Sequence, residues 1–327
     1  MPTDTIPSAV PAPIPSPFRP PWWLRNAHAQ TLWGSVLRRS PALDLTWEVF
    51  DLPDGDFVEV AWVDRETAPS APTVLVLHGL TGSVQSKPVR GLLQAFSNLG
   101  WHAGCFHFRG CGRGPNRTAI GYHSGKTDDP RHVLATLRGR SEGPLAVAGV
   151  SLGANVLLKL LGEDGATAPV DAAVAISPPL RLRPCVDRME RGLSQLYQAH
   201  LLRRLVAGVR EKVPLPVDAA ALARCRTFRE FDDLVTAPLH GFRDAEDYYQ
   251  RASSTPFLLG IRTPTLVIHA RDDPFFTPEV VPTAAELPDT VRFELSPTGG
   301  HVGFVGGASR YHLDTRVPEW LAPHLAR

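Results

Sequence analysis

Gly149-Val150-Ser151-Leu152-Gly153 decides the fold of this chain, because of the segments on either side of it. Residues 145–148 form a short apolar run typical of a buried strand, and residues 154–161 have the apolar spacing of a helix. Gly-x-Ser-x-Gly between a strand and a helix is the nucleophile elbow, a turn so tight that glycines must flank the serine. The sequence therefore predicts a Ser151 hydroxyl that stands clear of a sheet. A glycine-rich turn with an inert serine is the alternative.

Short strands alternate with helices from residue 73 onward, after a predicted antiparallel hairpin over 46–52 and 57–63. Such alternation predicts an α/β fold, a mostly parallel central sheet with helices on both faces. Right-handed crossovers place the carboxyl ends of the strands along one edge, where ligands bind. The expected strands are 73–78, 102–107, 145–150, 171–177, 264–270 and 290–296, and the expected helices are 86–99, 127–140, 152–162, 278–287 and 311–325.

Two segments depart from this alternation. Residues 180–256 show only helical periods, which predicts a helical cap or lid inserted above the strand ends, with ordinary surface helices as the alternative. Residues 1–21 contain eight prolines, which predicts an extended or disordered arm. Trp22-Trp23 would then open the α/β domain, expected over 22–327, because two adjacent indoles are costly to leave in water.

Composition narrows the class of protein. The 327 residues are 43% hydrophobic and 20% charged, with a formal net charge of +1 and neither a basic block nor an acidic tail. This balance argues against electrostatic capture of nucleic acid or of an anionic membrane surface. The four cysteines lack zinc-ligand or disulfide spacing, so free thiols in a reducing compartment are expected. With neither a secretory signal nor an apolar run of about 18 residues, we predict a soluble cytoplasmic protein; its oligomeric state is not readable.

A candidate acid and a candidate base follow Ser151 in the chain. A serine hydroxyl becomes an effective nucleophile when a histidine, oriented by a carboxylate, removes its proton. Asp272 and Asp273 follow the strand 264–270, and Asp273 is preferred because the turned chain can face the site there. Asp272 would then cap the turn or contact water, and a simple Asx turn before proline is the alternative. His301 lies in a glycine-rich loop after the last strand and is the expected general base.

An oxyanion hole is expected beside the serine. The negative oxygen that forms on an attacked carbonyl needs preorganised N–H donors. The backbone amides of Leu80, in the loop His78–Gly82 after the first parallel strand, and of Leu152 are the candidates. His78 is interpreted as a structural hydrogen-bonding group.

Other motifs do not point to a cofactor. Residues 125–127 look like the end of a phosphate-binding loop, but Ile120 stands where its first glycine is required. Arg109–Gly114 is glycine-rich without matching the dinucleotide-binding pattern. His123 and Asp128 have the four-residue gap of some lipid acyltransferases, a spacing that is common by chance.

Nine short motifs lie along the chain: Asn26–Thr31, His78–Ser83, Phe108–Gly112, Tyr122–Gly125, Gly149–Asn155, Phe231–Asp233, Tyr248–Tyr249, Asp272–Phe275 and Gly299–Gly303. On these motifs the chain, from Trp22 to near its C-terminus, resembles the α/β-hydrolase superfamily. Within it the chain resembles the YheT-like (hydrolase-4) group, which is related to eukaryotic α/β-hydrolase-domain lipid esterases and to yeast medium-chain ester synthase/esterases. The group usually has a second glycine where this chain has Ala154.

The resemblance implies a cofactor-independent serine esterase with Ser151, Asp273 and His301 as its triad. Its expected partner is a small-molecule ester with a short- to medium-chain or lipid-like acyl group, and no metal, nucleic acid or transmembrane segment is expected. Acyl transfer to an alcohol is the enzymatic alternative, and a binding protein that keeps the fold without the chemistry is the other.

Overall fold

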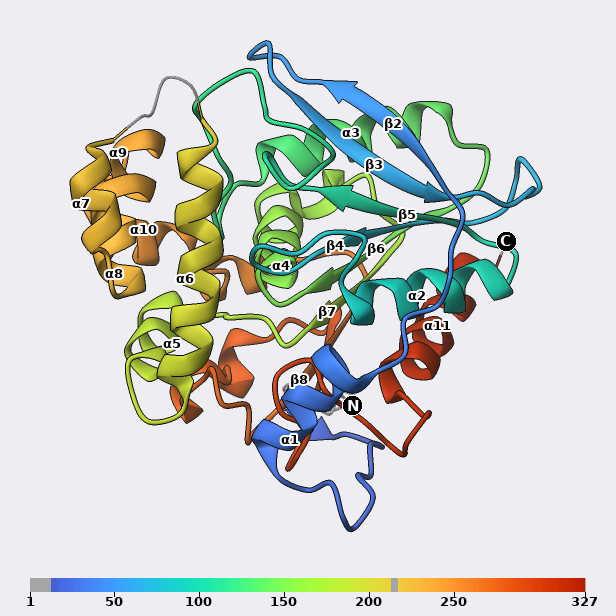
Figure 1. The fold of residues 1–327 in the computed structure, drawn as a ribbon. Coiled ribbons are helices and arrows are strands. Elements are labelled where there is room, and N and C mark those ends of the chain that lie inside the picture. The colour runs from blue at the N-terminus through green and yellow to red at the C-terminus, as the bar shows by residue number, and fades with distance from the viewer. Residues whose placement is uncertain (1–12, 213–216, 327) are drawn as a thin grey trace, which may run out of the picture.

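A nine-stranded sheet organises the chain in the computed structural model, which describes residues 13–212 and 217–326 (Figure 1). Its order is β1-β9-β8-β7-β6-β4-β5-β3-β2, and all neighbours are parallel except the pairs β2–β3 and β3–β5. The predicted mostly parallel α/β sheet is thus confirmed. The strands are β1 Ile14–Pro15, β2 Leu45–Asp51, β3 Phe57–Val63, β4 Thr73–Leu77, β5 His102–His107, β6 Leu145–Val150, β7 Ala172–Ile176, β8 Thr265–Ala270 and β9 Val291–Ser296.

Helices cover both faces of the sheet, because its central strands are apolar on both sides. In β4, Leu75 and Leu77 join the core under α3 (Asp128–Arg140) and α4 (Leu152–Asp164). Val74 and Val76 point the other way, toward α2 (Lys87–Asn98) and α11 (His312–Leu325). Alternation along one strand therefore supplies two cores.

Helical residues occupy the stretch between β7 and β8. In Figure 1 this insertion lies beside the sheet, at the left of the view, with α6 as its longest helix. The helices are α5 Leu182–Met189, α6 Ser194–Arg210, α7 Ala219–Arg224, α8 Phe228–Phe231, α9 Ala237–His240 and α10 Ala245–Ala252, with a π-helical turn at Asp232–Thr236.

The expected helix at 278–287 is wrong. The structure has two separate 3-10 turns there, Pro278–Val280 and Ala284–Glu286. Pro282 lies between them, and its missing N–H and its ring prevent one continuous helix.

The described part of the N-terminal segment packs on the domain. β1 pairs with β9 at the edge of the sheet, and Phe18 is buried in the core beside α11. Helix α1 (Ala27–Leu32) continues into a π-helical turn, Trp33–Leu37. Residues 1–12 of the predicted proline-rich arm lie outside the described residues. Across 13–212 and 217–326, no helix combines the length and the apolarity that crossing a bilayer requires.

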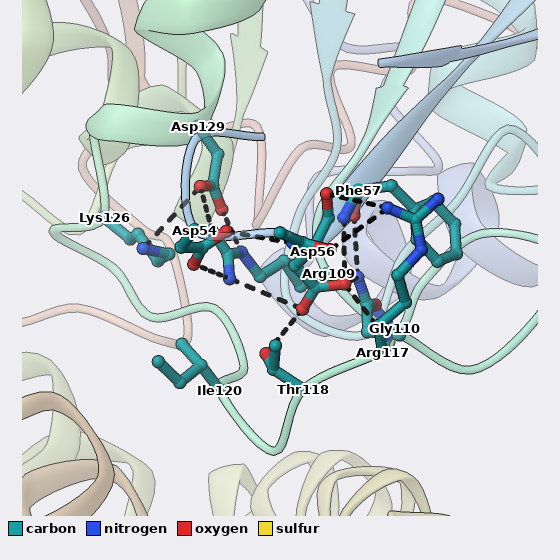
Figure 2. Close-up of polar contacts among 12 residues, drawn as sticks. Asp54, Asp56, Phe57, Arg109, Gly110, Arg117, Thr118, Ile120, Lys126 and Asp129 are labelled. Carbon is teal, nitrogen blue, oxygen red and sulfur yellow. Dashed lines mark hydrogen bonds and ion pairs between the residues drawn. The ribbon is translucent and has the colours of Figure 1, made fainter. Parts of the chain in front are cut away.

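A buried ion-pair network fixes the loop after β5 (Figure 2). The Arg109 guanidinium contacts both Asp129 carboxylate oxygens at 2.6 and 2.7 Å, and it also reaches Asp54 at 2.6 Å and Asp56 at 3.4 Å. The hydrogen bond from Arg109 lowers the pKa of Asp54. Thr118 donates its hydroxyl to Asp56. The network ties the β2–β3 turn, the loop and the start of α3 together.

Because three histidines are fully buried, we expect the fold to lose stability in acid. Burial lowers the pKa of His78 from 6.5 to about 3, and lowers those of His107 and His269 to about 4. Below pH 6.5 these histidines are therefore protonated in the unfolded chain but stay neutral in the folded chain. The free energy of unfolding is thus highest near neutral pH and falls as the pH drops toward 4. We expect a loss on the order of several kcal/mol over that range.

Denaturant unfolding at roughly pH 7.5 and pH 5 measures this loss. His269→Gln, which removes one of these buried histidines, should show a shallower pH dependence than the parent chain. Equal unfolding free energies at the two pH values would contradict the prediction.

Candidate active site

Ser151 stands in a strained turn between β6 and α4. Its φ of 52° and ψ of −116° are unusual for a non-glycine residue. A Cβ on Gly149 would lie 2.5 Å from the Ala154 Cα, and one on Gly153 would lie 2.4 Å from the Leu77 carbonyl oxygen. Both neighbours are backbone atoms that cannot swing aside, so only glycine fits at either position. The turn holds the Ser151 side chain at the carboxyl edge of the sheet, as the elbow pattern predicts.

Hydrogen bonds join the three predicted triad residues. The His301 Nε2 lies 2.9 Å from the Ser151 Oγ, and its Nδ1 lies 2.8 Å from the Asp273 Oδ2. Both His301 and Asp273 are buried. An ionised Asp273 accepts the Nδ1–H, which leaves Nε2 free to accept the serine proton. The arrangement can therefore activate the hydroxyl as a nucleophile.

Two aromatic rings hold the imidazole of His301 in place. The Phe275 ring stacks on it with centroids 4.0 Å apart and planes 11° from parallel. The Phe276 ring meets it edge-on at 5.3 Å. The Phe275 backbone N–H also donates to Asp273 Oδ1 at 2.9 Å, so the loop that carries the acid also packs on the base.

Asp272 and Asp273 have different partners. Asp272 Oδ1 accepts the Gly300 N–H at 3.0 Å and does not contact the imidazole, whereas Asp273 does. Burial raises the pKa of Asp272. Asp272 thus orders the loop just before His301.

Leu80 and Leu152, whose amides are the expected oxyanion donors, line the same cavity as Ser151. Leu152 is the first residue of α4, where the backbone N–H groups have no partner within the helix. Neither the Leu80 nor the Leu152 amide donates to another of the described residues. The His78 ring fixes the Leu80 loop: its Nε2 accepts the Phe108 N–H at 3.3 Å, and its Nδ1 lies 2.8 Å from the Gly79 carbonyl oxygen. His78 is thus a structural group in this site.

Residues of α1 also position the His301 loop, a role that the sequence did not reveal. The Thr31 Oγ1 accepts the His301 backbone N–H at 2.9 Å. The buried Gln30 amide accepts the Val305 N–H at 2.7 Å and donates to the Leu24 and Val305 carbonyls. The motif Asn26–Thr31 was the available signal, but its partners lie about 270 residues away in the chain.

An apolar cavity of about 130 Å³ adjoins Ser151. Asp232 brings a carboxyl group to its wall, where it accepts hydrogen bonds from Thr236 at 2.6 Å and from the Tyr249 hydroxyl at 2.8 Å. Burial raises the pKa of Asp232 to about 7. Much of the apolar wall comes from the insertion between β7 and β8, notably Val186, Met189, Leu201, Leu205 and Phe231.

Over the described ranges, no three or more His, Cys, Asp or Glu side chains come together in a way that could hold a metal ion.

Comparisons with known proteins find the α/β hydrolase fold and relatives named as esterases or lipases. A model of the α/β hydrolase fold family matches residues 72–308. "Putative esterase YheT" of Escherichia coli (strain K12) is 42% identical over 318 residues, which cover 94% of each chain. "Phospholipase ABHD3" of Mus musculus is 29% identical, over 89% of this chain and 74% of that protein. The Saccharomyces cerevisiae "Monoacylglycerol lipase" is 32% identical, over 78% of this chain and 58% of that protein.

A solved structure shows the same fold at lower identity. The esterase Pf2001 of Pyrococcus furiosus superposes with a TM-score of 0.58 at 17% identity, covering 88% of this chain and 99% of that one. At this identity the likeness concerns the fold alone.

Proposed function

This chain belongs to the α/β-hydrolase fold family, and from that premise we propose that it is a serine hydrolase that cleaves carboxylic esters. Ser151 is the proposed nucleophile, His301 the general base and Asp273 the residue that orients the imidazole. The observation that carries the proposal is the continuous Ser–His–Asp hydrogen-bonded chain, with distances of 2.9 and 2.8 Å. Relatives named as an esterase, a lipase and a phospholipase support the same reaction class.

The proposed reaction has two halves. In the first, His301 Nε2 takes the Ser151 proton while Oγ attacks the ester carbonyl carbon, and the Leu80 and Leu152 amides donate to the resulting oxyanion. The tetrahedral intermediate collapses, the C–O bond to the alcohol breaks, and the alcohol leaves with the proton from His301. In the second half, His301 deprotonates a water that attacks the acyl-enzyme. Collapse of that intermediate returns the proton to Ser151 and releases the acid.

The cavity supports a short to medium acyl group. A cavity of about 150 Å³ accommodates a molecule of roughly benzene's size, and the one here measures about 130 Å³. The insertion between β7 and β8 supplies its roof and thereby acts as a cap over the acyl group. A buried Ser194 hydroxyl on α6 donates to the Pro274 carbonyl at 2.6 Å, which anchors the cap beside the acid.

A series of nitrophenyl esters of graded chain length tests this proposal. We expect kcat/KM to be highest for acyl groups of about four to six carbons and to fall at least about tenfold by twelve carbons. Met189→Phe, which fills the cavity, should lower kcat/KM for the hexanoyl ester more than for the acetyl ester. Leu259→Ala changes an exposed residue of the 3-10 turn Thr255–Gly260 and serves as the control. No turnover of any ester in the series would refute the function, and a maximum at twelve carbons would refute the acyl-size limit.

A further inference from the structure

The helical segment 27–37 exposes its apolar side. Gln30, Thr31 and Gly34 are buried against the His301 loop, whereas Leu32, Val36 and Leu37 are 46 to 62% exposed. A surface helix of a globular protein normally does the reverse. The buried polar side is explained by the hydrogen bonds that hold His301, but the exposed apolar side has no partner among the described residues.

Two tryptophans extend this exposed apolar surface. Trp22 is 81% exposed, and Trp23 is 44% exposed with its ring packed 5.2 Å from that of Trp33. Trp22, Trp23, Leu32, Val36 and Leu37 are called the apolar rim below. Exposed apolar side chains grouped in this way mark an interaction site more often than scattered ones do.

The start of α6 continues the rim. The His28 ring on α1 stacks on Tyr197 at 5.8 Å, and its Nδ1 lies 3.1 Å from the Tyr197 hydroxyl, so the two helices touch. Leu193 and Leu196, next to this contact in the chain, are each more than half exposed. Figure 1 shows α1 and the α5–α6 junction toward the lower part of the molecule.

The exposed charge around the rim is mainly positive. Residues 5–43 contain four arginines and no acidic residue, although the whole chain carries only +1. Arg38 is buried against Asp314, whereas Arg19, Arg25 and Arg39 are exposed and form no ion pair with the described residues. Near the start of α6, Arg191 is exposed. Residues 188–210 contain a single acidic residue, Glu190. Cationic and apolar groups therefore share this surface.

We propose that the apolar rim docks on a bilayer surface that carries anionic lipid headgroups. Indole rings lie favourably at the headgroup level, aliphatic side chains enter the acyl boundary, and the arginines pair with lipid phosphates. Thr31, on the buried side of the same helix, accepts the His301 backbone N–H, so the helix that would dock also positions the His301 loop. This inference goes beyond the proposed function, because vesicle binding does not depend on ester cleavage.

Co-sedimentation of the full chain with vesicles tests the proposal. We expect binding to vesicles of phosphatidylglycerol and phosphatidylcholine in equal parts, and much weaker binding to pure phosphatidylcholine. Roughly 1 M salt, where the Debye length is about 3 Å, should weaken the binding. Trp22→Ser combined with Leu37→Ser should reduce the bound fraction at least about tenfold, and Arg25→Gln with Arg39→Gln should reduce the preference for the anionic vesicles.

Matched variants separate docking from general damage. Leu99→Ser with Leu259→Ser removes two comparably exposed apolar side chains elsewhere and should bind like the parent chain. The rim variant should retain hydrolysis of a soluble short-chain ester. Parent protein that stays in the supernatant, or a rim variant that binds normally, would overturn the proposal. So would concentration-dependent self-association, abolished in the rim variant, in a chain that binds no vesicles.

Discussion

Ser151→Ala is expected to lower kcat on a short nitrophenyl ester by about six orders of magnitude while leaving the fold intact. The side chain supplies the proposed attacking oxygen, and among the described residues Ser151 is the one whose hydroxyl bonds to the His301 Nε2, at 2.9 Å. The variant should still hydrolyse the ester about a thousandfold faster than the uncatalysed reaction in water, because the oxyanion amides and the cavity are unchanged. Single-turnover kinetics with the purified variant, together with its thermal unfolding curve, measures both parts of the prediction.

A second serine provides the control for this variant. Ser124 borders the same cavity, and its backbone N–H donates to the Tyr248 hydroxyl at 3.1 Å. Ser124→Ala should keep activity within about tenfold of the parent chain. A fluorophosphonate probe should label the parent chain and Ser124→Ala, but not Ser151→Ala. Near-full activity or labelling of Ser151→Ala would end the nucleophile assignment.

Asp273→Asn is expected to lower kcat by about four orders of magnitude. An amide at this position can donate to Nδ1, which favours the imidazole tautomer that carries its proton on Nε2 and cannot accept the serine proton. Asp272→Asn should cost no more than about tenfold, because the asparagine oxygen can still accept the Gly300 N–H. Steady-state kinetics of the pair decides between the two aspartates, and a larger loss for Asp272→Asn would reverse the assignment of the triad acid.

Local sequence patterns were enough to place the elbow and the candidate base. The tight turn at Ser151 requires glycine on either side of it, because a side chain there would clash with backbone atoms. A five-residue pattern between an apolar strand and a helix was therefore informative. His301 could be selected from twelve histidines because it follows the last strand in a glycine-rich loop. The alternation of strands and helices likewise specified the parallel sheet, since each short apolar strand is buried on both faces.

Long-range packing accounts for most of what the sequence did not reveal. Gln30 and Thr31 look like ordinary polar residues of a short helix, and their roles depend on a loop near the other end of the chain. The volume of the cavity depends on side chains from several helices and could not be inferred from any one of them. The two indoles at 22–23 were expected to open an ordered segment, and the packing instead leaves Trp22 mostly exposed.

The walls of the cavity and the reacting groups come from different parts of the chain. Ser151, Asp273 and His301 follow strands of the sheet, whereas Val186, Met189, Leu201 and Leu205 belong to the insertion. Mutations in those helices can therefore reshape the acyl site while the geometry of the reacting groups stays fixed by the sheet. The proposed acyl preference can thus change through the insertion alone, with the proposed triad left intact.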